Sequence, residues 1–254
     1  MPIIQSVDRA LRILDLFNEH NSEMKITEIS RKLDLNKSTT HSLLKTLKEH
    51  NYIKQDTDSG KYSLGLKLLE RGQFMLNSMD IREIARKFLI DLSVTTGQTT
   101  HLVILEGMYG VYIDKVEGAS AVVYSRIGKR VPIHSSAVGK SLMAFRQQEE
   151  IDELLQDYEF FVQTANTITD KQVYLDELTK VRTQGYSIDN EENEPGIYCI
   201  AVPIFDHANN VVAAISISTT KQTITPTLEQ EIVTTLKRTC SEISRALGNR
   251  KIYL

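Results

Sequence analysis

The sequence predicts an α+β protein in two parts: a small helical domain with a β-hairpin, then a larger domain on an antiparallel sheet. Helical patterns fill most of the first fifty residues and end in two short strand patterns. From Thr99 onward, strand patterns come first and last, with helical patterns between them. That order is typical of a sheet whose helices are segregated from its strands. Hydrophobic residues make up 41% and charged residues 25% of the chain, as in ordinary globular proteins.

Composition excludes several classes of protein. No apolar run approaches the roughly 20 residues of a membrane span, and the N-terminus lacks the pattern of a signal peptide. Two cysteines, Cys199 and Cys240, do not make a disulfide framework, so we expect a cytoplasmic protein. The six histidines show no metal-ligand spacing, so we expect neither a metal nor another cofactor.

The N-terminal part reads as three helices. Apolar residues at three- and four-residue spacing predict a first helix over Ser6–His20, with Ser6 as its N-cap. A short helix over Thr27–Leu33 follows, and a tight turn leads to a third helix over Lys37–Glu49. The side chain of Asn36 is positioned to cap that third helix. This is the order of a helix-turn-helix unit.

One face of the third helix is polar and basic. Lys37, His41 and Lys45 repeat at four-residue spacing, and serines stand beside them. Such side chains can donate to phosphates and base edges in a DNA groove. The alternative is that this face is merely solvated. The net charge of −3 excludes a protein that coats DNA through its overall charge, but local clusters can still bind it.

Two strand patterns, Tyr52–Gln55 and Lys61–Leu64, flank a polar turn and predict a hairpin. A hairpin after the third helix makes a winged helix-turn-helix, and Lys61 lies where a wing can reach a phosphate. The candidate DNA contacts are Arg9, Lys37, Ser38, Thr39, His41, Ser42, Lys45 and Lys61.

We expect three segments: a DNA-binding domain over residues 1–64, a linker helix over 65–80 and an effector domain over 81–254. Asp80 is placed to cap a helix over Ile81–Thr96. The expected later strands are His101–Glu106, Val111–Val116, Val122–Arg126, Tyr186–Asp189, Ile197–Phe205 and Val211–Thr219. The expected later helices are Ser136–Arg146, Glu150–Gln156, Lys171–Gln184 and Thr227–Leu247.

Several collinear motifs resemble the IclR family of bacterial transcriptional regulators, over nearly the whole chain. They are SVDRALRIL, LNKSTTHSLLKTL and GKYSLGLKLLERG in the first part, and IGKRVPIHSSAVGKSLMA, TITD, GYSIDNEENEPGIYCIAVPIFD and AAISIS in the second. The resemblance implies a GAF-like effector-binding domain on the antiparallel sheet, and a homodimer or dimer of dimers. One departure is Ser42, where the family commonly has Arg, so one guanidinium contact to DNA is absent.

The resemblance also implies an effector site at Ala137, Val138, Asp189, Ile197, Cys199, Ser216 and Ser218. Ser136 to Gly139 open a helix whose free N–H groups suit a carboxylate. Ser216 and Ser218 share one face of a strand, and Asp189 can accept a hydrogen bond from a hydroxyl. The alternatives are a buried apolar cysteine, serines on a solvated strand face, and an aspartate in a surface loop.

The sequence therefore predicts a transcription factor that binds double-stranded operator DNA and represses a catabolic operon in response to a small carboxylic acid. A sugar-derived keto acid is the candidate effector. We expect no catalytic residues and no enzyme activity. Two alternatives stay open, namely a small-molecule enzyme that uses Cys199 and a transcriptional activator.

Overall fold

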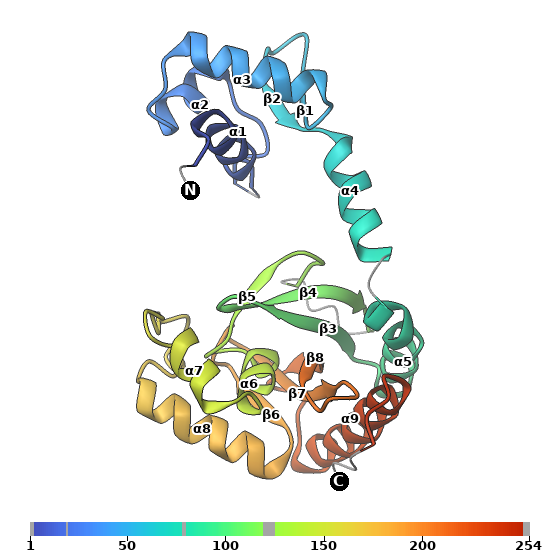
Figure 1. The fold of residues 1–254 in the computed structure, drawn as a ribbon. Helices are drawn as coiled ribbons and strands as arrows, with labels where there is room; N and C mark the ends of the chain where they lie inside the picture. Colours follow the sequence, from blue (N-terminus) through green and yellow to red (C-terminus); the bar gives the residue numbers. More distant parts are fainter. Residues whose placement is uncertain (1–2, 19, 78–79, 119–124, 251–254) are drawn as a thin grey trace. The chain divides into compact units, whose positions relative to one another are not determined.

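The computed structural model describes residues 3–18, 20–77, 80–118 and 125–250 (Figure 1). The chain divides into two compact units, Met1–Ser78 and Met79–Leu254. The domain boundaries expected after residues 64 and 80 stay a prediction. Most of the expected strand Val122–Arg126 lies outside the described residues, and its last two residues belong to no strand.

The first unit is a winged helix-turn-helix. Asn36 caps the third helix as expected, since its Oδ1 accepts from the Thr39 backbone N–H at 2.8 Å. The wing is an antiparallel hairpin in which Lys54 stands opposite Ser63. Its elements are α1 (Gln5–Asp15), α2 (Ile26–Lys32), α3 (Lys37–Glu49), β1 (Ile53–Gln55), β2 (Tyr62–Leu64) and α4 (Leu66–Asn77).

The first helix differs from the sequence prediction. It begins at Gln5 with Ile4 in the N-cap position, so Ser6 is inside the helix and does not cap it. The buried face of α1 is centred on Ile13, whereas Val7 and Leu11 are 53% and 57% exposed. Of the apolar residues at this spacing, Val7 and Leu11 therefore point to solvent, whereas Phe17 lies in the core and Leu14 packs against it. The core of the unit consists of Ile13, Phe17, Met24, Ile29, Leu44, Ile53 and Tyr62.

The second unit is built on a six-stranded sheet in the order β5-β4-β3-β8-β7-β6, with every neighbouring pair antiparallel. The α+β prediction is confirmed. Its elements are α5 (Asp80–Thr96), β3 (Thr99–Glu106), β4 (Tyr109–Val116), β5 (Arg130–Pro132), α6 (Ala137–Ala144), α7 (Gln148–Leu154), α8 (Lys171–Gln184), β6 (Ser187–Asn190), β7 (Ile197–Phe205), β8 (Val211–Thr220) and α9 (Pro226–Ala246).

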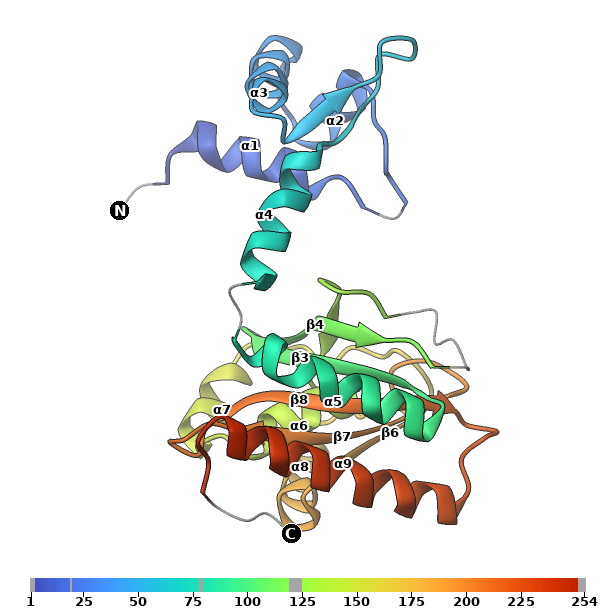
Figure 2. The ribbon, with the colours of Figure 1, turned by 90° about the vertical axis from the view of Figure 1, so that its right-hand side faces the viewer.

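Two helical layers enclose this sheet. Figure 2 shows α5 and α9 side by side on one face, and α6 lies on the other face with α7 and α8 beyond it. The apolar contact between α6 and the sheet includes Val103, Val138, Leu142 and Ala201. The short strand β5 was not predicted, because three residues carry too weak a periodicity.

Helix α6 approaches the chain before it so closely that a side chain at Gly139 does not fit. A Cβ built on Gly139 would lie 2.5 Å from the Cα of Ile133 and 2.7 Å from its carbonyl oxygen. Because both are backbone atoms, they cannot turn aside as a flexible side chain would. Glycine therefore fixes how deeply the first turn of α6 enters the domain.

We expect Gly139→Ala to destabilise the second unit by about 1–3 kcal/mol, because the helix must move to admit the methyl group. Calorimetry of the full chain would show a lowered midpoint for the transition that unfolds the sheet. Gly72→Ala is the matched control, since a Cβ there meets nothing within 4 Å. An unchanged midpoint in Gly139→Ala would contradict the close approach.

Candidate functional site

The polar face of α3 is open to solvent. Lys37, His41 and Lys45 are all exposed, as are the two serines between them. The Ser42 hydroxyl donates to the Ser38 carbonyl oxygen at 3.1 Å, so it lies along the helix while keeping its acceptor lone pairs. The structure thus brings five of the candidate DNA contacts onto one uninterrupted face.

The other three candidates lie apart from that face. Thr39 is half-buried, and its backbone N–H is used by the helix cap. Lys61 lies on the wing, with its Nζ 3.7 Å from an oxygen of Glu23. Arg9 is half-buried and belongs to α1, a different helix from α3.

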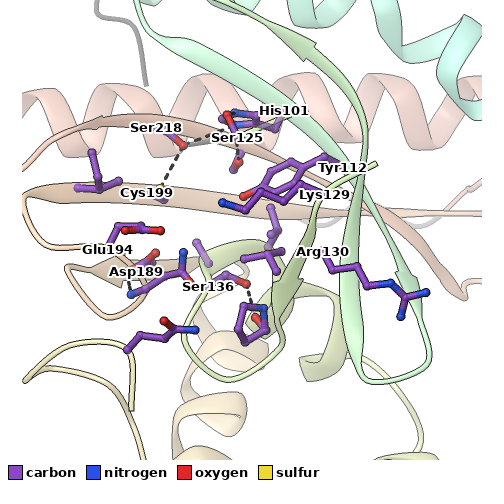
Figure 3. Close-up of a pocket in the computed structure, with 18 residues that line it drawn as sticks. His101, Tyr112, Ser125, Lys129, Arg130, Ser136, Asp189, Glu194, Cys199 and Ser218 are labelled. Carbon is purple, nitrogen blue, oxygen red and sulfur yellow. Dashed lines mark hydrogen bonds between the residues drawn. The ribbon is translucent and has the colours of Figure 1, made fainter. Parts of the chain in front are cut away.

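The second unit contains a cavity of about 220 Å³ between the sheet and the start of α6 (Figure 3). All seven expected effector residues line it: Ala137, Val138, Asp189, Ile197, Cys199, Ser216 and Ser218. They come from α6, β6, β7 and β8. The volume is below the range usual for drug-sized ligands and suits a small metabolite.

One wall of the cavity carries positive potential. Ser136 caps α6, since its hydroxyl accepts from the Gly139 N–H at 3.1 Å, and the next N–H groups, of Ala137 and Val138, have no partner inside the helix. Lys129 points into the cavity, whereas the guanidinium of Arg130 points away from it (Figure 3). A helix N-terminus beside an ammonium group favours an anion.

A second wall consists of hydroxyl groups around a buried histidine. The His101 Nε2 lies 2.7 Å from the Ser125 hydroxyl, and its Nδ1 lies 3.3 Å from Ser216 and 3.5 Å from Ser218. Burial, together with a smaller contribution from the charge of Lys115, lowers the pKa of His101 to about 3. The imidazole is therefore neutral, and it orients the hydroxyl groups on either side of it.

Acidic groups form the third wall. Asp189 is buried, and its Oδ1 accepts from the backbone N–H groups of Glu192 at 2.8 Å and Asn193 at 3.2 Å. Burial raises the pKa of Asp189 to about 7, and the nearby charge of Glu192 contributes to the rise. Both protonation states are thus present near neutral pH, so the group can donate to or accept from a ligand hydroxyl. Glu194 lines the same side.

Cys199 has the chemistry of a thiol and not of a nucleophilic thiolate. Burial raises the pKa of its thiol, and the charge of Asp189 raises it further. Its Sγ lies 3.1 Å from the Ser218 hydroxyl. His134 is in a different place, where its ring nitrogens contact Tyr158 and the carbonyl of Phe161. In the described part of the chain, the sulfur therefore contacts a hydroxyl group and not the imidazole of His134.

Sequence reasoning missed several residues that line the cavity, namely His101, Tyr112, Ser125, Lys129, Gln163, Asn193 and Glu194. His101 is the instructive case. It stands directly opposite Ser216 because β3 pairs with β8, and these residues are far apart in the chain. Strand order supplies that pairing, and no local pattern contains it.

Among residues 3–18, 20–77, 80–118 and 125–250, no three His, Cys, Asp or Glu side chains gather as a metal site would require. No helix in the described part of the chain is long and apolar enough to cross a membrane.

Comparison with known proteins agrees with this architecture. Residues 6–57 match the model described as IclR helix-turn-helix domain, and residues 73–245 match the one described as Bacterial transcriptional regulator IclR C-terminal. The regulator XynR of Escherichia coli is 49% identical, with 98% of this chain and 99% of XynR covered. The DNA-binding transcriptional repressor YiaJ of Escherichia coli is 33% identical, with 96% and 88% covered.

Among solved structures, the IclR protein of Thermotoga maritima superimposes with a TM-score of 0.79 at 40% identity, over 96% of this chain and 99% of that one. The similarity thus extends through both units and includes the order of their elements. The chain belongs to the IclR family of bacterial transcriptional regulators.

Proposed function

We propose that this ligand-responsive regulator is a repressor of a catabolic operon and that its effector is a small hydroxylated or keto carboxylic acid. The observation that carries the proposal is the cavity, which sets a positively charged wall opposite hydroxyl and carboxyl groups. The relative YiaJ, which is named as a repressor, supports the sign of regulation. The proposal includes no catalytic step.

The ligand chemistry follows from the three walls. A carboxylate of the ligand would accept from the N–H groups of Ala137 and Val138 and from Lys129. Its hydroxyl or keto oxygens would meet the serines around His101, while Asp189 in its neutral form would hydrogen-bond a ligand hydroxyl or keto oxygen. A six-carbon sugar acid in its keto form combines these groups.

The DNA contact is proposed at the exposed face of α3, entering the major groove. Lys37 and Lys45 would neutralise phosphates, and the shorter side chains, including His41, would reach base edges. With Ser42 in place of the family's usual Arg, the two lysines carry more of the electrostatic affinity.

A homodimer or a dimer of dimers is the proposed assembly. The first unit exposes two sets of apolar side chains, whose contact with water is unfavourable in a monomer. They are Ile3 and Ile4 before α1 with Val7 and Leu11 within it, and Leu66, Leu69 and Phe74 along α4. A two-fold dimer formed there would present two α3 helices to half-sites about one helical turn apart.

The effector class can be tested with three matched compounds. We expect 2-oxo-D-gluconate to bind the protein, because it has both a carboxylate and hydroxyl groups. Hexanoate, which has the carboxylate alone, and D-glucose, which has hydroxyl groups alone, should each bind at least tenfold more weakly, the equivalent of about 1.4 kcal/mol. Isothermal titration calorimetry measures all three, and equal binding of 2-oxo-D-gluconate and hexanoate would contradict the role of the hydroxyl wall.

The DNA surface can be tested by Lys37→Ala and Lys45→Ala. Each should weaken binding to DNA from upstream of the protein's own gene, and each should reduce the slope of log affinity against log salt by about one. Fluorescence anisotropy at several salt concentrations gives both quantities. The control is Lys180→Ala, a lysine 67% exposed in the other unit. Two variants that bind like the control would exclude α3 as the reading helix.

Asp189 should make acid binding depend on pH. Because its pKa is about 7, an anionic ligand meets a neutral group at lower pH and a carboxylate at higher pH. We expect affinity for 2-oxo-D-gluconate to fall between about pH 6 and about pH 8, by up to tenfold per unit once Asp189 is ionised. His101 stays neutral over this range.

Asp189→Asn should flatten that profile, since an amide does not titrate. Ser218→Ala is the comparison variant, because it alters the same cavity and leaves the titrating group in place. A slope that persists in Asp189→Asn would assign the pH dependence to another group, such as Glu192, whose pKa burial also raises.

A further inference from the structure

A β-bulge in β4 divides the strand between the cavity and helix α5. Val103 stands opposite Tyr112, but its neighbour Leu102 stands opposite Asp114, so Ile113 is an extra residue in β4. Consecutive residues of β3 face opposite sides of the sheet. Their partners therefore do so too, although Tyr112 and Asp114 are two apart and would share a face in a regular strand.

The two side chains accordingly reach different surroundings. Tyr112 lines the cavity and is labelled in Figure 3. Asp114 is fully buried on the other face, where an oxygen of its carboxylate accepts from Arg86 of α5 at 2.6 Å. Its second oxygen lies 3.7 Å from Nε of Arg82. Because of the bulge, two residues only two positions apart in the chain reach different places: Tyr112 lines the cavity and Asp114 contacts α5.

Two arginines of α5 also hold the backbone of the bulge itself. Arg82 Nε donates to the carbonyl oxygen of Ile113, the extra residue, at 3.1 Å. Arg86 donates to the carbonyl oxygen of Lys115 at 3.0 Å as well as to Asp114. A displacement of this short stretch of β4 therefore acts directly on the first turns of α5.

On the cavity side, the same stretch is tied to the segment that carries Lys129. The Tyr112 N–H donates to the Lys129 carbonyl oxygen at 3.2 Å, and the Gly128 N–H donates to the Tyr112 carbonyl oxygen at 2.8 Å. A ligand that binds Lys129 thereby acts on both sides of Tyr112. The connection from cavity to helix consists of backbone hydrogen bonds on the cavity side and, on the helix side, of the contacts that Arg82 and Arg86 make with the β4 backbone and with the buried Asp114.

The ion pairs between α5 and the sheet that the structure describes lie at one end of the helix, at Arg82 and Arg86. Farther along, the contacts are made by the buried apolar Leu89 and Leu92 and by the Ser93 hydroxyl, which donates to the carbonyl oxygen of Glu117 at 3.2 Å. A buried ion pair adds little stability over apolar residues of similar size, because desolvating the charges offsets their attraction. The charged contacts are made by the N-terminal end of α5, which follows the α4 linker in the chain. We therefore relate these charges to the position of that end and not to a gain in stability.

We propose that Arg82, Arg86 and Asp114 are coupling residues, which transmit occupation of the cavity through the β4 bulge to the start of α5 and so to the DNA-reading unit. The inference rests on the proposed function, since it requires that an acid in the cavity alters DNA affinity. In this view the acid stabilises one position of the bulge, and the arginines make α5 follow it.

The test compares DNA affinity without and with saturating 2-oxo-D-gluconate, using the full chain. We call the DNA affinity without the acid divided by the DNA affinity with it the coupling ratio. Coupling between two sites in one protein usually changes affinity by about 5–150-fold, and we expect a coupling ratio in that range for the wild type. Arg86→Gln should reduce the ratio to under about threefold, while the affinity of the DNA-free protein for 2-oxo-D-gluconate changes by less than about threefold. The Arg86 side chain is 47% exposed, so Gln fits in its place, and Arg82 remains as a charged partner of the buried Asp114.

Ser93→Ala is the matched control. It removes a hydrogen bond from the same helix to the chain just after β4, where the Ser93 hydroxyl donates to the Glu117 carbonyl oxygen at 3.2 Å. We expect it to keep the wild-type ratio. Hydrogen exchange supplies a second readout: adding 2-oxo-D-gluconate should change amide protection in the first turns of α5 in the wild type and in Ser93→Ala, and not in Arg86→Gln.

The outcomes separate the two proposals. If Arg86→Gln keeps the wild-type ratio, the proposal that these are coupling residues is overturned and the proposed function is left intact. If Arg86→Gln loses both the ratio and the binding of 2-oxo-D-gluconate, the coupling proposal is overturned as well, because the arginine would then only support the structure of the cavity. A wild-type protein that binds 2-oxo-D-gluconate without any change in DNA affinity overturns both proposals.

Discussion

The geometry of the cavity depends on one buried ion pair. Lys140, on α6, is fully buried and donates to both carboxylate oxygens of Glu192, at 2.7 and 2.9 Å, while Glu177 of α8 lies 3.6 Å away. Glu192 belongs to the loop that follows β6, the strand of Asp189, and that carries Glu194. The pair therefore joins the wall that attracts an anion to the wall that carries acids, at a set separation.

Charge in the cavity follows from the same arrangement. Two carboxyl groups, Asp189 and Glu192, lie close together away from water, and a single ammonium group is shared between Glu192 and Glu177. Burial raises the pKa of both carboxyl groups, that of Asp189 to about 7, although the charge of Lys140 acts to lower both. The group that faces the cavity thereby changes its protonation state near neutral pH.

Local patterns predicted the first unit well and the cavity only in part. Helix α3 and its Asn36 cap follow from spacing within thirteen residues, and both are confirmed. The family resemblance identified Ser216 as a site residue, but its neighbour His101 comes from a strand that is distant in sequence. The exposed side of α1 was also beyond a periodicity argument, because both of its faces carry apolar residues and tertiary contact with Ile13 decides between them.

Buried charge in the second unit is concentrated where the sheet region meets its helices. On one side, Lys140 of α6 pairs with Glu192; on the other, Arg82 and Arg86 of α5 pair with Asp114. Apolar contacts can slide by small amounts at little cost, whereas a charge-assisted hydrogen bond has a preferred distance and direction. One such set of contacts on each face of the sheet restricts its movement relative to α5 and α6, so that a small displacement at the cavity is transferred to a helix.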